Sequence, residues 1–71
     1  MKEITINHEP VELFKILKFE GLASSGAEAK ILISEGLIRV NNQIEKQKRK
    51  KILVGDTISF NSETFLIVAR A

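Results

Sequence analysis

The stretch that decides the fold is SGAEAKILISEGLIRVNN, residues 25–42. Ser25 and Glu28 have the S-x-x-E spacing of a capping box, which predicts that a helix begins at Gly26. Gly36 is a natural C-terminal stop, so the helix is expected over residues 26–35. A short strand over residues 37–40 and a two-residue Asn-Asn turn are predicted next, because asparagine tolerates the positive φ of a type I′ hairpin.

The predicted helix has apolar side chains around much of its circumference. An apolar surface that is this wide indicates packing on more than one side. The remaining polar line is Gly26, Lys30 and Ser34, spaced at i, i+4 and i+8. We therefore expect only this narrow strip to face solvent or a ligand, with Lys30 as its charge.

The flanking segments predict one further helix and several short strands. Residues 3–6 alternate as an edge strand does, and Pro10 suits the first turn of a helix over residues 11–20 that stops at Gly21. Residues 43–45, 57–60 and 64–69 have strand patterns separated by turn residues. The predicted fold is α+β, with two adjacent helices packed on a small, mainly antiparallel sheet in a single domain, residues 1–71.

Charge is concentrated in KQKRKK, residues 46–51, which we call the basic segment. It holds five of the 11 Lys and Arg residues and no acid, whereas the rest of the chain has six basic and nine acidic residues and a net charge of −3. Such a segment is either a solvated loop or an arm that binds phosphates. The second interpretation is favoured, because predicted strands bracket the segment and Arg39 lies one hairpin strand away.

Composition argues against catalysis and against a metal centre. The chain has no cysteine, one histidine (His8) and one aspartate (Asp56, in a predicted turn). It contains no glycine-rich nucleotide loop, P-loop or serine elbow. The prediction is therefore a protein that is not an enzyme, with no cofactor, metal or small-molecule substrate. The first ten residues lack a signal-peptide pattern and no apolar run could span a bilayer, so a cytoplasmic location is expected.

The start of the second predicted helix is a further candidate binding surface. Ser25 is expected to cap it, and the backbone N–H groups around Ser24 and Gly26 could also receive a phosphate, reinforced by Lys30. Lys15 and Lys18 lie together on the polar face of the first helix and matter only if that face adjoins Lys30. The chain has no Tyr or Trp, which disfavours recognition of single strands by stacking and favours structured RNA.

Several short motifs, in this order and spacing, resemble the ribosomal protein S-four-type RNA-binding domain, also called the αL motif. They are GLASS at residues 21–25, AK at 29–30 followed by Ile33, GLIRVN at 36–41 and VGDTI at 54–58. The similarity covers about residues 11–60, and the acidic-then-basic run at residues 45–51 is similar to a small stand-alone bacterial subgroup. The resemblance implies two helices on a small sheet, with RNA bound by the paired helices and the neighbouring loop, and no catalysis.

The resemblance also assigns residues, with two departures. Many members have arginine where this chain has Gly26, so Lys30 and the basic segment are expected to supply more of the phosphate contacts. Many members also have glycine where this chain has Asn42. Together with the charge pattern, this gives the expected RNA-binding residues: Lys15, Lys18, Ser25, Gly26, Lys30, Arg39, Asn41, Lys46, Lys48, Arg49, Lys50 and Lys51.

The leading hypothesis is thus a monomer that binds structured RNA through backbone phosphates, with ribosomal RNA or an assembly intermediate as the specific candidate. The alternative is an adaptor that docks on a ribosomal or replication factor, in which Leu66 and Val68 would be partly exposed. A binder of double-stranded DNA ranks third, because no predicted helix has an Arg- or Asn-rich face for reading the major groove.

Overall fold

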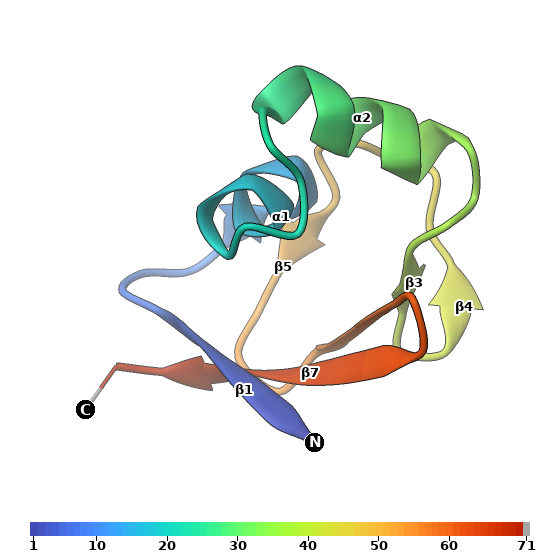
Figure 1. The fold of residues 1–71 in the computed structure, drawn as a ribbon. Coiled ribbons are helices and arrows are strands. Elements are labelled where there is room, and N and C mark those ends of the chain that lie inside the picture. The colour runs from blue at the N-terminus through green and yellow to red at the C-terminus, as the bar shows by residue number, and fades with distance from the viewer. Residues whose placement is uncertain (71) are drawn as a thin grey trace.

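The computed structural model describes residues 1–70 and has two helices above one face of a mixed sheet (Figure 1). The five-stranded sheet has the order β1-β7-β6-β3-β4, with β1 and β7 parallel and the other pairs antiparallel. A separate two-stranded antiparallel ladder joins β2 and β5. The predicted α+β class is confirmed. The elements are β1 (Lys2–Ile6), β2 (Val11–Glu12), α1 (Leu13–Phe19), α2 (Gly26–Ser34), β3 (Arg39–Val40), β4 (Gln43–Ile44), β5 (Lys51–Ile52), β6 (Thr57–Phe60) and β7 (Glu63–Ala69).

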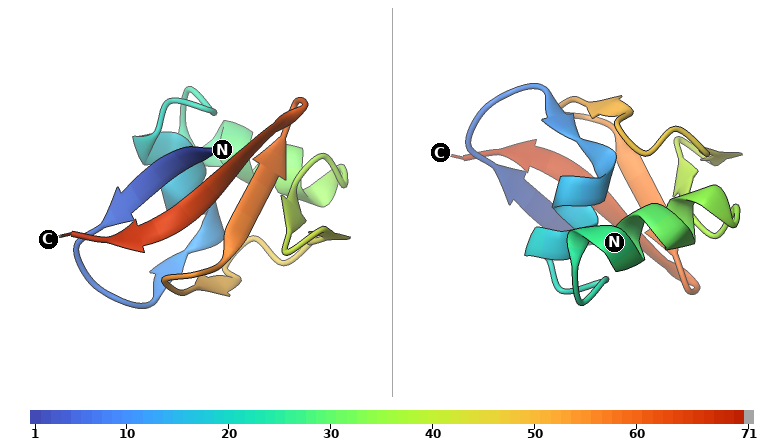
Figure 2. Two further views of the ribbon diagram at one scale, coloured as in Figure 1. Left: turned by 90° about the horizontal axis from the view of Figure 1, so that it is seen from below. Right: turned by 90° about the horizontal axis from the view of Figure 1, so that it is seen from above.

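The core lies between the helices and the helix-facing side of the sheet. Seen from below and from above in Figure 2, the helices lie over the strands. Side chains that alternate along β1, β6 and β7 supply one wall, and the inner faces of α1 and α2 supply the other. The core is entirely apolar, and no buried polar side chain interrupts it within residues 1–70. Its fully buried large side chains are Leu13, Ile16, Leu17, Ile33, Ile38, Ile52, Ile58 and Ile67.

The first helix begins later than its sequence pattern predicts. Val11 and Glu12 form β2 and pair with Ile52 and Lys51, so α1 starts at Leu13. Pro10 precedes this ladder and is not in the first turn of the helix. The prediction was wrong because a tertiary partner, β5, takes up Val11 and Glu12, and local periodicity cannot reveal such a partner.

The turns behave as predicted. Asn41 and Asn42 have φ values of 52° and 68°, which is the left-handed geometry that a type I′ turn requires. Asn61 and Ser62 adopt the same geometry between β6 and β7. Gly36 follows α2 with a φ of 76°, a conformation that a residue with a side chain rarely adopts.

The side chain of Asn41 ties two turns together. Its Oδ1 accepts a hydrogen bond from the backbone N–H of Thr57 at 2.9 Å, and its Nδ2 donates to Asp56 Oδ1 at 3.1 Å. Asp56 in turn accepts from the backbone N–H of Leu53 at 2.8 Å. The turn between β3 and β4 is thereby fixed to the Gly55-Asp56 turn, so the amide of Asn41 has a structural role.

The exposed side of α2 is broader than the predicted strip. Ala29 and Ile33 are buried, whereas Ala27, Glu28 and Ile31 are exposed and Lys30 is half-buried. The prediction was wrong because α2 packs along one side only, against α1 and the sheet. On the far face of the sheet, Leu66 and Val68 are half-buried.

Candidate functional site

The basic segment is fixed by its backbone to the start of α1. No side chain caps this helix. Instead, Lys50 O accepts from the N–H of Leu13 at 2.8 Å, and Lys48 O accepts from the N–H of Phe14 at 3.1 Å. These bonds satisfy two of the amides that a helix leaves free at its N-terminus. The side chains of the basic segment remain exposed, so its charges project from an anchored loop next to the positive end of a helix.

Three cationic side chains converge on the ring of Phe14. Lys30 Nζ from α2 lies 4.7 Å from the ring centroid, Arg49 Cζ from the basic segment 5.3 Å, and Lys15 Nζ from α1 6.0 Å. Cation–π attraction at exposed positions contributes about 0.5–1 kcal/mol per pair, enough to bias rotamers while leaving the charges accessible. Phe14 therefore gathers cations from three segments into one place, which we call the Phe14 cluster (Phe14, Lys15, Lys30, Arg49).

One carboxylate, Glu12, lies at the edge of the Phe14 cluster. Its oxygens are 3.3 Å from Lys15 Nζ and 3.3 Å from Arg49 Nη1. Loss of hydration around Glu12 acts to raise its pKa, but the hydrogen bonds and positive charges of Lys15 and Arg49 outweigh this, so the pKa lies below its ordinary value. Glu12 thus stays ionised and holds two of the three cations in position.

The titration of Glu12 provides a test of this arrangement. Because the pKa of Glu12 is lowered by folding, its contribution to stability is complete above the pKa of the unfolded chain and is lost as pH falls through the folded-state pKa. Carboxyl NMR titration should find Glu12 titrating below the ordinary glutamate range. The double variant Lys15→Ala, Arg49→Ala should move this pKa upward, and an unchanged pKa would contradict the ion pairs. Glu63→Gln is the control, because it leaves both partners of Glu12 in place.

The N-terminus of α2 lies against the same cluster. Ser25 Oγ accepts from the N–H of Glu28 at 3.1 Å, which confirms the predicted cap. Glu28 accepts a hydrogen bond from the N–H of Ser24 at 2.8 Å, not from that of Ser25. The Ser24 amide was expected to be free for a phosphate, and this bond occupies it. A Cβ placed on Gly26 would lie 3.7 Å from the ring of Phe14, which is an ordinary contact.

The structure brings together some of the predicted residues and separates others. Lys15, Lys30 and Arg49 meet at Phe14, with Ser25 and Gly26 beside them. Lys46 lies at the opposite end of α2, with its Cε 3.5 Å from a Cβ built on Gly36. Residues 46–49 therefore run along α2 toward its N-terminal end, and Lys50 and Lys51 continue beyond Arg49 to the start of α1 and into β5.

Three predicted residues lie apart from the Phe14 cluster. Arg39 is exposed on the far face of the sheet, where it lines a shallow hollow with Ser59 and Glu63. Lys18 is exposed in the last turn of α1. Asn41 is occupied by its bonds to Asp56 and Thr57.

Sequence reasoning missed Phe14 and Glu12. Phe14 is half-buried and packs against the edge of the core, with its ring reaching the helix surface. The available signal was Phe14-Lys15 at a helix start, but only the packing of α2 and the basic segment shows where the ring points. No group of three potential metal-binding side chains exists in the part of the chain that the structure describes, and no helix there is long and apolar enough to cross a membrane.

Comparisons with known proteins place these observations in a family. The S4 domain family matches residues 4–68. YbcJ of Escherichia coli (strain K12), whose name describes it as a candidate RNA-binding protein, is 47% identical over 62 residues, covering 87% of this chain and 89% of YbcJ. The YbcJ of Shigella flexneri, named as uncharacterized, has the same identity and coverage.

A solved structure extends the similarity to three dimensions. The solution structure of E. coli YbcJ, described as revealing an αL motif involved in RNA binding, superposes with a TM-score of 0.72 at 43% identity. The superposition covers 97% of this chain and 89% of that one. The arrangement of two helices on a mixed sheet is therefore shared with a structure of known αL type.

Proposed function

Because this chain belongs to the S4 domain family, we propose that it is a non-catalytic protein that binds structured RNA through backbone phosphates. The observation that carries the proposal is the Phe14 cluster beside the anchored basic segment. It sets positive charges from α1, α2 and the loop on one surface of a body that is otherwise slightly acidic. The description of YbcJ as a protein with an αL motif involved in RNA binding supports the same function.

The geometry favours structured RNA over a flexible single strand. The loop backbone is bonded to α1, so the backbone positions that carry its charges are held in place, which suits the regular phosphates of a folded RNA. The ring of Phe14 is covered by cations and cannot also serve as an open platform for stacking a base. The expected readout is the shape and backbone of the RNA.

The proposed contacts fall into three groups. Lys30, Arg49 and Lys15 form the centre, with Ser25 and Gly26 permitting close approach of the backbone. Lys46 and Lys48 extend the contact along α2, and Lys50 and Lys51 extend it toward β5. Lys18 and Arg39 add long-range attraction from the periphery, and Asn41 acts by fixing the turn beside β3.

Salt dependence tests the proposal. RNA affinity, measured by fluorescence anisotropy with a labelled RNA hairpin, should fall steeply as salt is added, because each phosphate that is neutralised releases counterions. A site that engages about five phosphates should give a log–log slope of roughly −4. A slope near zero would contradict phosphate recognition and favour an apolar docking surface.

Introducing an arginine at position 26 should strengthen RNA binding. The substitution Gly26→Arg places a guanidinium beside the Phe14 cluster, and the contact of its Cβ with Phe14 is tolerated. One further phosphate contact should raise RNA affinity by about five- to tenfold at low salt. Gly26→Gln, similar in size and uncharged, is the matched control, and an equal gain with Gln would refute a charge effect.

The specific partner that we propose is ribosomal RNA or an assembly intermediate. The protein would bind it as a monomer in the cytoplasm. Its test is crosslinking of the protein to RNA in cells followed by sequencing. Enrichment of particular ribosomal RNA helices is the expected result, and recovery of background RNA alone would contradict the assignment.

A further inference from the structure

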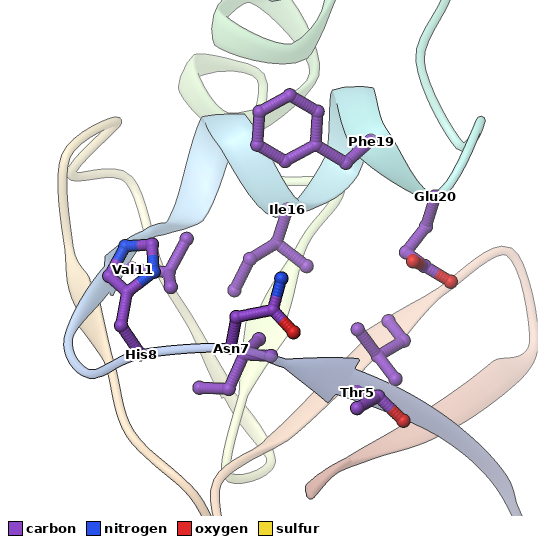
Figure 3. Close-up of a pocket in the computed structure, with 9 residues that line it drawn as sticks. Thr5, Asn7, His8, Val11, Ile16, Phe19 and Glu20 are labelled. Carbon is purple, nitrogen blue, oxygen red and sulfur yellow. The ribbon is translucent and has the colours of Figure 1, made fainter. Parts of the chain in front are cut away.

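On the side of α1 away from the Phe14 cluster, an apolar groove lies between α1 and β1 (Figure 3). Its volume is about 280 Å³. Ile4 and Ile6 line it from the strand, and Ile16 and Phe19 line it from the helix. Phe19 is 70% exposed, which is unusual for so large an apolar side chain. We call this feature the β1–α1 groove.

The strand beside the groove is an open sheet edge. β1 pairs with β7 on one side and has no neighbour on the other among the residues that the structure describes. Ile6 O accepts from the N–H of Arg70, so the backbone groups of Ile6 point toward β7. Because both backbone groups of a residue in a parallel strand point to the same side, those of Glu3 and Thr5 point outward. An added strand could therefore bond to Glu3 and Thr5.

Two carboxylates lie near the groove, one on its rim and one on the other face of β1. Glu20 lines the groove, and Glu3 lies exposed on β1. No lysine or arginine lines the groove; of the cations near it, Lys2 is paired with Glu63, and Arg70 donates a hydrogen bond to Asn7 at the end of the groove. The two surfaces of α1 thus differ in sign, with cations at the Phe14 cluster and carboxylates at the β1–α1 groove.

We propose that β1 and the β1–α1 groove form a docking site for an extended protein segment in which apolar residues alternate with Lys or Arg. The segment adds a strand to the edge of β1 and bonds to the backbone of Glu3 and Thr5. Its alternate side chains point to opposite faces, so one apolar side chain enters the groove between Ile16 and Phe19. Its basic side chains then point to the opposite face of the sheet, on the side of Glu3, while Glu20 borders the groove itself. The protein would then hold RNA on one side of α1 and a basic protein segment on the other.

The charge of the groove favours a basic protein segment over a nucleic acid strand and over a second copy of this chain. A nucleic acid strand that stacked a base on Phe19 would bring its phosphates close to Glu3 and Glu20, where they are repelled. A second copy of this chain joined edge to edge through β1 would bring a second set of the same carboxylates to the contact. A cationic extended segment can bond to the free edge of β1 and is attracted by the nearby carboxylates.

The test uses two synthetic nine-residue peptides, one alternating valine with lysine and the other alternating valine with glutamate. Isothermal titration at moderate salt should show saturable binding of the basic peptide only, and NMR should show amide shifts at Glu3, Thr5 and Phe19. Binding of both peptides alike, binding of neither, RNA-induced shifts centred on Phe19, or a dimer joined through β1 in sedimentation would each overturn the proposal.

Two variants localise the contact. Thr5→Pro removes an outward N–H and leaves the bonds of β1 to β7 intact, so it should weaken basic-peptide binding about tenfold, whereas Thr5→Val should leave it unchanged. Glu3→Lys with Glu20→Lys should weaken it further. RNA affinity should not fall in any of these variants, so failure of the peptide site is distinguishable from failure of the RNA site. Peptide affinity that is insensitive to Thr5→Pro would overturn strand addition.

Discussion

Reversing three charges of the basic segment, with Lys48, Arg49 and Lys50 each changed to Glu, is expected to lower RNA affinity at least about a hundredfold. Three charge-assisted contacts are lost, each worth about 1–1.5 kcal/mol, and the new carboxylates repel phosphates. The measurement is fluorescence anisotropy with the same RNA hairpin used for wild type. The slope of log affinity against log salt should also become shallower, since fewer counterions are released.

The fold should survive this change. The bonds that cap α1 come from the backbone carbonyls of Lys48 and Lys50, and substitution leaves these in place. The lost ion pair of Arg49 with Glu12 is at the surface, where such pairs contribute about 0–1 kcal/mol. Circular dichroism should therefore show a folded protein with only a slightly lower Tm.

The matched control reverses three other exposed charges, with Lys2, Lys18 and Arg70 each changed to Glu; of these, only Lys18 belongs to the proposed contacts, at their periphery. It has the same net charge as the test variant, but its changes lie outside the Phe14 cluster and the basic segment. We expect a much smaller loss of RNA affinity. If both variants lost affinity equally, binding would depend on net charge alone and the assignment of the site would be wrong.

Ile33→Ala is expected to have the largest effect on stability. Ile33 is fully buried on the inner face of α2, and truncating a buried isoleucine to alanine costs about 2–5 kcal/mol. The total stability of a small domain is only about 5–15 kcal/mol, and a chain of this size buries a modest share of its surface. Thermal unfolding should show Tm lowered by at least about 10 °C.

The control for Ile33 is two residues away in the same helix. Ile31 is 55% exposed, so Ile31→Ala removes the same atoms without leaving a cavity in the core. Its effect on Tm should be within a few degrees, and alanine also favours the helix slightly. Similar losses for both variants would mean that α2 packs on a second surface, as its sequence alone had suggested.

The secondary structure followed from the sequence wherever short-range chemistry decides it. Ser25 and Glu28 cap α2 because their spacing places them one turn apart. Asn41 and Asn42 turn the chain because their side chains tolerate positive φ. The start of α1 did not follow, because β5, which is 40 residues further along the chain, pairs with Val11 and Glu12.

Some features of the candidate site also followed from the sequence, and others required the tertiary structure. The sequence by itself determined the charge of the basic segment, the cap at Ser25 and the α+β class, since these depend on composition and on neighbours within one or two turns. Only the tertiary structure decided that Lys15, Lys30 and Arg49 meet at Phe14, that Glu12 holds two of them, and that Ile33 is buried whereas Ile31 is exposed. The physical reason is that convergence and burial depend on how separate segments pack, and local sequence patterns do not encode the direction in which a side chain meets a distant one.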